Sequence, residues 1–329
     1  MGKRDLIKTR HRYFLGIFIT PQTILITGSS GMIGTRLCEL LKEQGYSVIG
    51  ADIRPNCWNR EIDKITISTD LCRQDDIARL PADIDMVIHL AANARVHDLV
   101  IRPELARDNY LMLFNVLEFC REHAIKNFLF SSSREVYGSP GSTACAEHCA
   151  DVRYCESPYA ASKIGGEALV HAYQRCYGID FIITRFSNVY GMYDTSNRVI
   201  PHFIQRTLDN EDLVVYGKDK CLDFSYIDDT VSGVISCIRR FSAVKNTTFN
   251  ISSGRSVPLA RIAYLIRDSM DGKNTVVIRE NRTGEVLQSA VDISRAQKEL
   301  EYEPNVTVEE GIIRSIVWYR NYFSSNSRA

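Results

Sequence analysis

The sequence has no excess of charge of either sign. Its 329 residues carry 40 Lys and Arg against 40 Asp and Glu, a formal net charge of zero. Proteins that bind nucleic acid usually carry a basic surplus or a basic stretch, so we expect no nucleic-acid partner. The chain also lacks an internal repeat, a low-complexity tract and a linker rich in Pro or Gly. Its length allows a large core and about two lobes.

No apolar run reaches the roughly 20 residues that are needed to span a bilayer. The N-terminal run Tyr13–Ile19 follows several basic residues and superficially resembles a signal peptide. It is too short to span, no convincing small-residue cleavage site follows it, and Pro21 leads almost directly into the first expected strand. We therefore expect residues 1–22 to form an N-terminal extension, and we expect no membrane span.

The cysteines do not form a recognisable framework. Ten of them are scattered along the chain, which favours reduced thiols in a cytoplasmic enzyme over a set of disulfides. The tightest group is Cys145, His148, Cys149 and Cys155, and it contains no paired Cys-x-x-Cys unit of the kind that structural zinc sites use. We interpret this group as a cysteine-rich loop and expect no metal ion.

A short β-branched run is followed directly by three evenly spaced glycines. Thr23–Thr27 predicts a buried strand, and Thr35–Gln44 has helical periodicity. Between them stand Gly28, Gly31 and Gly34, in the spacing G-x-x-G-x-x-G rather than the commoner G-x-G-x-x-G. A strand, a glycine turn and a helix in this order predict a site for the pyrophosphate of a dinucleotide. A plain glycine turn is the alternative.

The next expected strand, Tyr46–Ala51, ends at an acidic residue. Asp52 lies about 20 residues from the glycine turn, where dinucleotide-binding folds place a carboxylate against the ribose hydroxyls. A carboxylate also repels a 2′-phosphate, so we expect NAD rather than NADP as cofactor. Arg54 argues in the opposite direction, because an arginine could accommodate that phosphate. A turn-capping role for Asp52 is the other alternative.

Strand-like and helical segments alternate through the first half of the chain. Further strands are expected at 63–69, 86–90, 127–131 and 181–185, and helices at 103–122 and 158–177. This alternation predicts an α/β fold, a Rossmann-type doubly wound parallel sheet with helices on both faces. From about Tyr190 the elements become shorter and more polar. We expect an NAD-binding domain at 23–190 and a smaller substrate lobe at 191–329, with segments that return to the main sheet.

Tyr159 and Lys163 lie four residues apart in the expected helix 158–177. Residues with this spacing share a helix face, so the lysine ammonium is expected to lower the pKa of the tyrosine, normally about 10. A tyrosine tuned in this way can accept a proton from a sugar or alcohol hydroxyl as hydride leaves the same carbon. The pattern Y-x-x-x-K is weak alone and gains its weight from following a dinucleotide site.

Several motifs occur together in a fixed order. They are the glycine turn, Asp70–Leu71, His89–Ala92, Asn109, Ser131–Gly138, the Tyr159/Lys163 pair and Arg185–Gly191. With them the chain resembles the extended short-chain dehydrogenase/reductase family from residue 23 to about 322, and within it the NAD-dependent nucleotide-sugar epimerases and dehydratases. The resemblance implies cofactor contacts at Gly28, Gly31, Met32, Ile33, Gly34, Asp52, Asp70, Leu71, Leu90, Ala91, Ala92, Asn109, Ser131, Tyr159, Lys163 and Phe186.

The same resemblance implies the residues around the substrate. Ser133 matches the hydroxyl residue that binds the reacting sugar oxygen, Tyr159 the base, and Lys163 the lysine that holds the nicotinamide ribose. Substrate contacts are implied at Ser133, Arg134, Glu135, Asn188, Val199, Arg282 and Ser289. Leu222 stands where the family usually has a phosphate-binding arginine, so that contact is absent or comes from Lys218 or Lys220. His89 is expected to pack, without a chemical role.

Two departures from the family pattern bear on the reaction. Dehydratases of the family typically carry Asp-Glu after the catalytic hydroxyl, whereas this chain has Arg134-Glu135. An arginine stays protonated and cannot be that acid. It either pairs with Glu135 or binds a substrate carboxylate such as that of a uronate. Ser289 falls where glucose-restricted 4-epimerases have a bulky tyrosine, which predicts room for a 2-acetamido group.

The sequence therefore predicts a UDP-sugar 4-epimerase, with UDP-N-acetylglucosamine and UDP-N-acetylgalactosamine favoured over UDP-glucose and UDP-galactose. The first alternative is a decarboxylase or dehydratase that uses Glu135. An alternative of another class is a non-catalytic NAD-binding sensor, which the intact Ser133, Tyr159 and Lys163 disfavour. By resemblance we also expect a homodimer through the helices 103–122 and 158–177.

Overall fold

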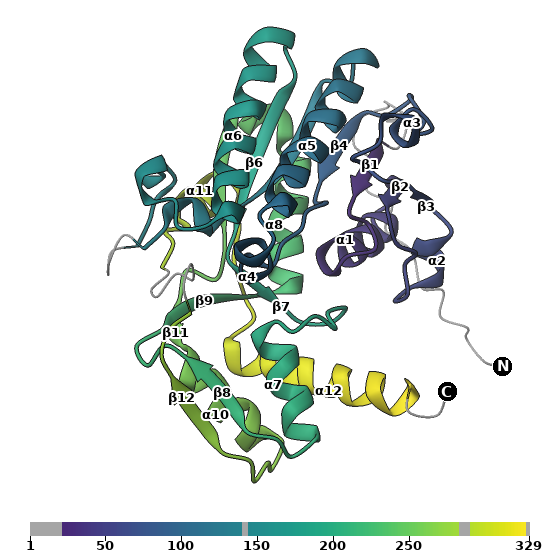
Figure 1. Cartoon of the computed structure of the whole chain (residues 1–329). Coiled ribbons are helices and arrows are strands. Elements are labelled where there is room, and N and C mark those ends of the chain that lie inside the picture. The colour runs from purple at the N-terminus through teal and green to yellow at the C-terminus, as the bar shows by residue number, and fades with distance from the viewer. Residues whose placement is uncertain (1–21, 140–143, 283–289, 327–329) are drawn as a thin grey trace, which may run out of the picture.

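A seven-stranded sheet forms the larger lobe of the protein (Figure 1). The computed structural model describes residues 22–139, 144–282 and 290–326. The strand order is β10-β6-β5-β4-β1-β2-β3, and every neighbouring pair is parallel. The strands are β1 (Thr23–Thr27), β2 (Ser47–Asp52), β3 (Thr66–Ser68), β4 (Met86–His89), β5 (Asn127–Ser133), β6 (Asp180–Phe186) and β10 (Thr247–Ile251).

Helices cover both faces of this sheet because its strands are apolar on both sides. Ile24 and Ile26 of β1 point into one core, with α1 (Met32–Glu43) and α8 (Ile227–Arg239). Leu25 between them points into the other core, with α5 (Glu104–Glu122) and α6 (Pro158–Tyr177). Nearly continuous apolar strands are typical of parallel sheets buried on both faces. The predicted Rossmann-type α/β fold is confirmed.

A smaller lobe lies below the carboxyl ends of the strands in Figure 1. It contains a three-stranded sheet of β7 (Asn188–Tyr190), β9 (Cys221–Tyr226) and β11 (Ser256–Pro258), and a parallel pair of β8 (Leu213–Tyr216) and β12 (Val276–Arg279). Its longer helices are α7 (Val199–Leu208), α10 (Leu259–Ser269) and α12 (Val308–Asn326). Because β10 pairs with β6, the chain returns to the main sheet after entering this lobe. The domain boundaries given above stay a prediction.

The remaining elements are short. They are α2 (Arg60–Asp63), α3 (Gln74–Ile77), α4 (Val96–Ile101), α9 (Phe241–Val244), α11 (Ser294–Leu300) and the 3₁₀ turns η1 (Arg134–Tyr137), η2 (Glu147–Cys149) and η3 (Val152–Tyr154). The expected strand at 63–69 is wrong at its start. Asn59 caps a helical turn there by accepting from the backbone N–H groups of Glu61 and Ile62, so β3 is left with three residues.

The described part of the chain contains neither a membrane-spanning helix nor a cluster of metal-ligating side chains. Within residues 22–139, 144–282 and 290–326, no helix is long and apolar enough to cross a membrane. In the same residues, no three His, Cys, Asp or Glu side chains come together as a metal ion would require.

Candidate active site

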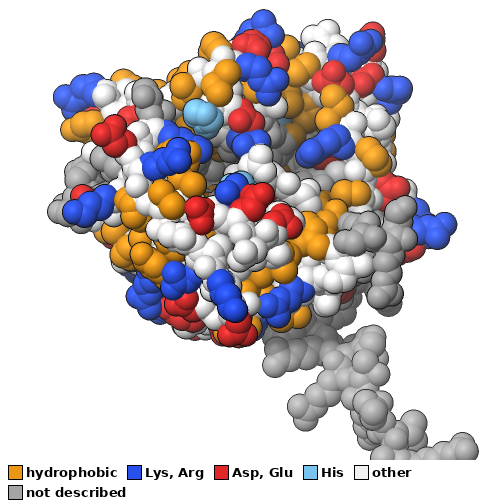
Figure 2. Space-filling view, turned by 60° about the horizontal axis from the view of Figure 1, so that its bottom comes forward, with side chains coloured by type: hydrophobic (Ala, Val, Ile, Leu, Met, Phe, Trp, Pro, Cys, Tyr) orange, Lys and Arg blue, Asp and Glu red, His pale blue; other side chains and the backbone are white. Residues whose placement is uncertain are grey.

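One cavity of about 1590 Å³ lies between the two lobes, at the carboxyl ends of the parallel strands. Figure 2 shows a hollow on this side of the molecule, with basic and acidic side chains gathered around it. The cavity brings together nearly all of the residues that the sequence singles out. They are Gly28, Gly31, Met32, Ile33, Gly34, Asp52, Asp70, Leu71, Leu90, Ala91, Ala92, Ser131, Ser133, Arg134, Glu135, Tyr159, Lys163, Phe186, Asn188, Val199 and Arg282.

The glycine turn admits no side chains at two of its positions. Gly28 has a φ of +76°, and a Cβ there would lie 2.8 Å from the backbone nitrogen of Ala91. A Cβ on Gly34 would lie 2.0 Å from the carbonyl oxygen of Gly28. Helix α1 follows from Met32, and its N-cap residue Gly31 provides no side chain to bond the first N–H groups. The turn therefore fits a pyrophosphate, with backbone donors at the helix N-terminus.

Asp52 ends β2 at the edge of the same cavity. Its two carboxylate oxygens accept from the backbone N–H groups of Ser30, at 3.0 Å, and Arg54, at 2.9 Å. These bonds fix the carboxylate in place, and each oxygen keeps a second lone pair that can accept a ribose hydroxyl. Asp70 and Leu71 follow at the cavity wall. This set of residues fits the adenosine half of a dinucleotide.

Tyr159 and Ser133 are hydrogen-bonded to each other in the cavity. Tyr159 is in the first turn of α6, where Ser157 caps the helix by accepting from the N–H of Ala160. Ser133 is the last residue of β5. Burial raises the pKa of the Tyr159 phenol to about 12, and the hydrogen bond from Ser133 opposes that rise. Two hydroxyls are thus placed to share a proton with one bound oxygen.

Lys163 does not act on Tyr159 as expected. Its ammonium donates to the carbonyl oxygen of Ser131 at 2.7 Å and lies 5.8 Å from the centre of the Tyr159 ring. Burial lowers the pKa of Lys163 to about 8, and the carboxylate of Glu167 partly opposes that. The expectation of a lowered pKa for Tyr159 is wrong for this structure, because desolvation of the phenol outweighs the favourable charges around it.

Two residues expected near the cofactor lie behind the cavity wall. Asn109 does not line the cavity: its side chain bonds the backbone of Asn93 at 2.7 and 3.0 Å and the hydroxyl of Ser162 at 3.2 Å. It therefore supports the loop that carries Asn93. His89 is fully buried, its Nδ1 bonds the Thr27 hydroxyl at 2.9 Å, and burial lowers its pKa to about 3. As expected, His89 is a packed residue.

Arg134 and Glu135 follow Ser133 in the turn η1. Both are buried, and Nη2 of Arg134 lies 2.8 Å from Oε1 of Glu135. The backbone N–H of Glu135 donates to the Ser133 hydroxyl oxygen at 3.2 Å, which holds the turn against the end of β5. The ion pair that the sequence offered as one explanation of Arg134 is therefore present.

The smaller lobe contributes cations to the lining of the cavity. Leu222 lines the cavity where the family's arginine is expected, and Lys220, which is buried, lines it as well. Lys218 does not line it, so Lys220 is the better placed of the two lysines. The guanidinium of Arg282 stacks on the ring of Tyr216, with its carbon 3.8 Å from the ring centre. Ser289 lies outside the described residues.

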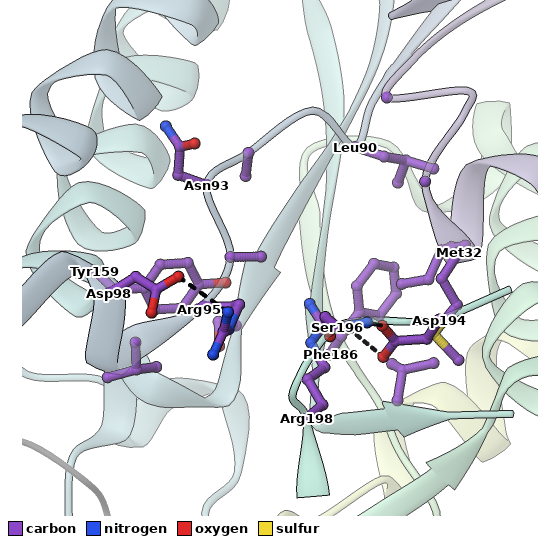
Figure 3. A pocket seen from close by; sticks show the side chains of 18 of the residues that line it. Met32, Leu90, Asn93, Arg95, Asp98, Tyr159, Phe186, Asp194, Ser196 and Arg198 are labelled. Carbon is purple, nitrogen blue, oxygen red and sulfur yellow. Dashed lines mark hydrogen bonds and ion pairs between the residues drawn. The ribbon is translucent and has the colours of Figure 1, made fainter. Parts of the chain in front are cut away.

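Two ion pairs are among the charged cavity residues that were not anticipated from the sequence. Arg95 and Asp98, 3.3 Å apart, lie on the same side of the cavity as Tyr159, whereas Asp194 and Arg198, 3.8 Å apart, lie on the other (Figure 3). All four come from segments without a regular spacing: the start of α4 and the loop before α7. The sequence feature that could have indicated them is the polar loop after each of β4 and β7, because such loops lie near the carboxyl edge of the sheet.

Comparisons with known proteins agree with this geometry. Residues 24–252 match the NAD dependent epimerase/dehydratase family. An uncharacterized UDP-glucose epimerase of Bacillus subtilis is 29% identical over 91% of this chain and 98% of its own length. The UDP-glucuronic acid 4-epimerase from Bacillus cereus, solved with UDP-glucuronic acid and NAD, has a TM-score of 0.85 at 26% identity and covers 92% of this chain and 100% of its own.

A dehydratase is equally similar in structure. The dTDP-glucose 4,6-dehydratase DesIV of Streptomyces venezuelae, solved with NAD, has a TM-score of 0.85 at 26% identity and covers 92% of this chain and 98% of its own. The family match extends over more than half of the chain and includes the glycine turn, Ser133, Tyr159 and Lys163. The chain therefore belongs to the NAD dependent epimerase/dehydratase family.

Proposed function

We propose that the protein is an NAD-dependent 4-epimerase of UDP-sugars. The observation that supports this most directly is the hydrogen-bonded pair of hydroxyls, Ser133 and Tyr159, in the cavity that holds the glycine turn. NAD is the cofactor of the chain. When bound, NAD⁺ supplies a hydride acceptor and a positive charge next to the reacting carbon.

In the proposed reaction, Tyr159 acts as its phenolate, which the positive charge of bound NAD⁺ would favour. It takes the proton of the sugar 4-hydroxyl while Ser133 holds the same oxygen through its own hydroxyl. The hydride of C4 leaves at the same time, so the sugar becomes a 4-ketone. The ketone turns over in the cavity, its other face receives the hydride, and Tyr159 returns the proton. Lys163, fixed by the Ser131 carbonyl, is placed to hold the nicotinamide ribose.

Arg134 favours epimerisation over loss of water. A dehydratase needs a second acid beside the reacting hydroxyl, and a guanidinium keeps its proton at any physiological pH. Glu135, the neighbouring carboxylate, is held by Arg134 through one oxygen. The position after Ser133 therefore lacks the acid that dehydration requires, which favours epimerisation at C4.

The far end of the cavity suits a nucleotide diphosphate. Lys220 and Arg282 supply positive charge there, and a planar guanidinium matches phosphate oxygens. Firm binding at this end would let the sugar turn over without leaving. We propose a UDP-sugar by similarity to the Bacillus cereus enzyme, whose structure holds UDP-glucuronic acid. The preference for 2-acetamido sugars rests on Ser289, outside the described residues, and stays a prediction.

A decarboxylase or dehydratase that uses Glu135 is the second candidate. Oε2 of Glu135 is buried and has no hydrogen-bond partner among the described residues, and its charge raises the pKa of Tyr159. A carboxylate oxygen so close to the reacting group could accept a proton from a neighbouring carbon or water. This observation keeps the candidate, and the experiment below separates it from epimerisation.

We also propose a homodimer through α5 and α6. The two helices pack side by side, and α5 exposes the apolar side chains Tyr110, Leu111 and Phe114. An exposed apolar patch of this kind is typical of an interaction surface. Analytical ultracentrifugation of the protein and of Phe114→Lys tests the proposal, because the substitution should shift a dimer to a monomer.

The function is tested by incubating the purified protein and NAD with UDP-glucose, UDP-N-acetylglucosamine and UDP-glucuronate and recording proton NMR spectra over time. Epimerisation inverts C4 and leaves every other carbon in place, so a new anomeric signal with the couplings of the 4-epimer is expected. Loss of carbon dioxide or of water gives a pentose or a deoxy sugar with different spectra. Either of those products, without the 4-epimer, would overturn the proposal.

A further inference from the structure

Arg134 is placed next to the sugar by its position in the chain. It directly follows Ser133, the last residue of β5, and it starts the turn η1. Its side chain lines the cavity, but only 8% of the residue is exposed. Arginine is almost never buried unless its charge is paired, so a buried arginine beside the reacting hydroxyls needs a reason.

The ion pair with Glu135 does not use the full capacity of either partner. Nη2 of Arg134 donates to Oε1 of Glu135, while Nη1 of Arg134 and Oε2 of Glu135 are buried without a hydrogen-bond partner among the described residues. An ion pair that served only stability would be expected to use both nitrogens and both oxygens. A buried charged donor without a hydrogen-bond partner costs free energy. A ligand that supplies an acceptor removes this cost, and its binding affinity rises accordingly.

The lining of the cavity carries an excess of positive charge. Ten Lys and Arg side chains line it against six Asp and Glu side chains. Its ion pairs include Arg134 with Glu135, Arg95 with Asp98, and Arg198 with Asp194, whereas Lys163 donates to a backbone carbonyl. The excess favours an anionic substrate, and a carboxylate on the sugar would meet part of it.

The chemistry of a pyranose restricts where that carboxylate can be. In the proposed function, Ser133 and Tyr159 hold the oxygen on C4. Arg134 lines the same cavity, so we place it against a substituent on a carbon beside C4. Of those carbons, C3 carries a hydroxyl, and C5 carries either a CH₂OH group or, in a uronate, a carboxylate. Nη1 of Arg134, which has no partner among the described residues, can donate a charge-assisted hydrogen bond to a carboxylate, and such a bond is stronger than one to a neutral hydroxyl.

We propose that the sugar carries a carboxylate on C5, so that the substrate is a nucleotide-linked uronate, and that Arg134 binds this carboxylate and determines the specificity. The inference rests on the proposed position of the sugar against Ser133 and Tyr159. It is compatible with the room that Ser289 predicts at C2, because C2 and C5 are on opposite sides of the ring. A 2-acetamido uronate would satisfy both.

Binding to a protein that cannot turn over tests this inference separately from the reaction. Calorimetric titration of the NAD-loaded Tyr159→Phe variant with UDP-glucuronate and with UDP-glucose compares two ligands that differ only at C6. We expect UDP-glucuronate to bind at least about tenfold more tightly, the scale of one hydrogen bond between charged groups. In the Tyr159→Phe background, Arg134→Gln should abolish the difference in affinity between the two ligands. Arg134→Lys keeps the positive charge but not the guanidinium, so it should retain part of that difference.

Arg153→Gln is the matched control. Arg153 is exposed, pairs with Asp151 and does not line the cavity. The substitution Arg153→Gln therefore removes the same charge as Arg134→Gln at a position that does not contact the sugar. Thermal unfolding of each variant checks that it is folded before titration. The inference is overturned if UDP-glucose binds as tightly as UDP-glucuronate, or if the ratio survives in Arg134→Gln. The proposed epimerase fails separately, through the NMR products above.

Discussion

Burial opposes the ionisation of Tyr159 more strongly than its neighbours favour it. Its pKa is raised to about 12 although Ser133, Arg198 and Arg134 all act to lower it. A phenol in this state keeps its proton until a positive charge or a hydrogen-bonded substrate oxygen lowers the cost of ionisation. The proton of the sugar hydroxyl and that of the phenol are therefore expected to move only when the hydride acceptor and the substrate are both bound.

Tyr159→Phe removes the proton acceptor and keeps the ring. Because positioned acid–base groups contribute about 100-fold or more, turnover should fall by at least that factor. The NAD dissociation constant should stay within about twofold, because the glycine turn and Asp52 are untouched. Steady-state kinetics and NAD titration measure the two quantities. Tyr154→Phe, an exposed tyrosine outside the cavity, is the control, and a Tyr159→Phe enzyme that kept most of its kcat would contradict the role.

Lys163 gives the site a pH dependence that can be predicted. Burial lowers the pKa of its ammonium to about 8, so the charge is present below that pH and is lost as the pH rises through it. If the ammonium holds the nicotinamide ribose, kcat/KM should fall above about pH 8. In Lys163→Arg the guanidinium keeps its proton, so the decrease in kcat/KM should begin only above pH 9. This shift in pH is expected even if the variant is slower overall. An unchanged pH profile in the variant would assign the fall to another group.

At the scale of elements, α6 carries Tyr159 and Lys163, the side chains proposed to be catalytic, and packs closely on β5. A Cβ added at Gly166 would lie 2.7 Å from the ring of Phe130, whose centre lies 5.0 Å below the Lys163 ammonium. A Cβ at the preceding Gly165 would meet nothing closer than 3.6 Å. The two neighbouring glycines thus form a matched pair, one in tight contact with the strand and one in ordinary contact with α5.

Gly166→Ala should force α6 away from β5 and so displace Tyr159 and Lys163. Overpacking of this kind costs about 1–3 kcal/mol of unfolding free energy, and kcat should fall with it. Gly165→Ala should change stability by at most about 1 kcal/mol in the favourable direction, because alanine is the better helix former. Urea unfolding and kcat of both variants are the measurements. Equal effects of the two substitutions would show that the close contact with Phe130 does not position α6.

The sequence alone was sufficient to predict those parts of the site whose residues all lie in one turn or one helix. The glycine turn and the pair Tyr159/Lys163 each lie within one turn or helix, so spacing alone predicts that their members are neighbours. It was not sufficient where a side chain crosses to another element. The ammonium of Lys163 reaches the carbonyl of Ser131 on β5, and Arg198 enters the cavity from the loop before α7. No local pattern encodes these tertiary contacts.

The expected strand 63–69 was wrong for a similar reason. Its residues have strand propensity, but the cap by Asn59 stabilises a helical turn that ends at Asp63. The structure resolves this competition in favour of the cap, and β3 pairs with β2 over Thr66–Ser68 only. Propensity over a few residues is weaker than a hydrogen bond that starts a helix.

At the scale of the whole molecule, an aromatic cluster joins the cofactor side to the last helix. Trp58 and Tyr193 line the cavity, and both contact Trp318 of α12, with ring centres 5.8 and 5.6 Å away. Tyr322 stacks on Trp318 at 5.2 Å. Glu39 of α1 accepts a hydrogen bond from the Tyr193 hydroxyl at 2.9 Å. Helix α12 therefore supports two residues of the cavity wall, although none of its own described residues lines the cavity.

This arrangement predicts that Trp318→Ala weakens NAD binding from outside the cavity. Trp58 and Tyr193 lose the ring that they pack against, so this part of the cavity wall is less well ordered and NAD binding must order it. Aromatic pairs contribute about 0.5–1.5 kcal/mol, which corresponds to a roughly two- to tenfold weaker affinity. Both tryptophans of the chain lie in this cluster, so tryptophan emission during an NAD titration reports on it directly.

Two further variants separate this coupling from a general loss of stability. Trp318→Phe keeps an aromatic ring and should retain most of the affinity, and Val317→Ala, exposed on the same helix, should leave it unchanged. In a double-mutant cycle, Trp318→Ala should change the NAD dissociation constant very little once Trp58→Ala is present. The contact between the two rings, which transmits the effect, is then already absent. If Trp318→Ala lowered the melting temperature while the NAD dissociation constant stayed the same, α12 would stabilise the fold without acting on the cofactor site.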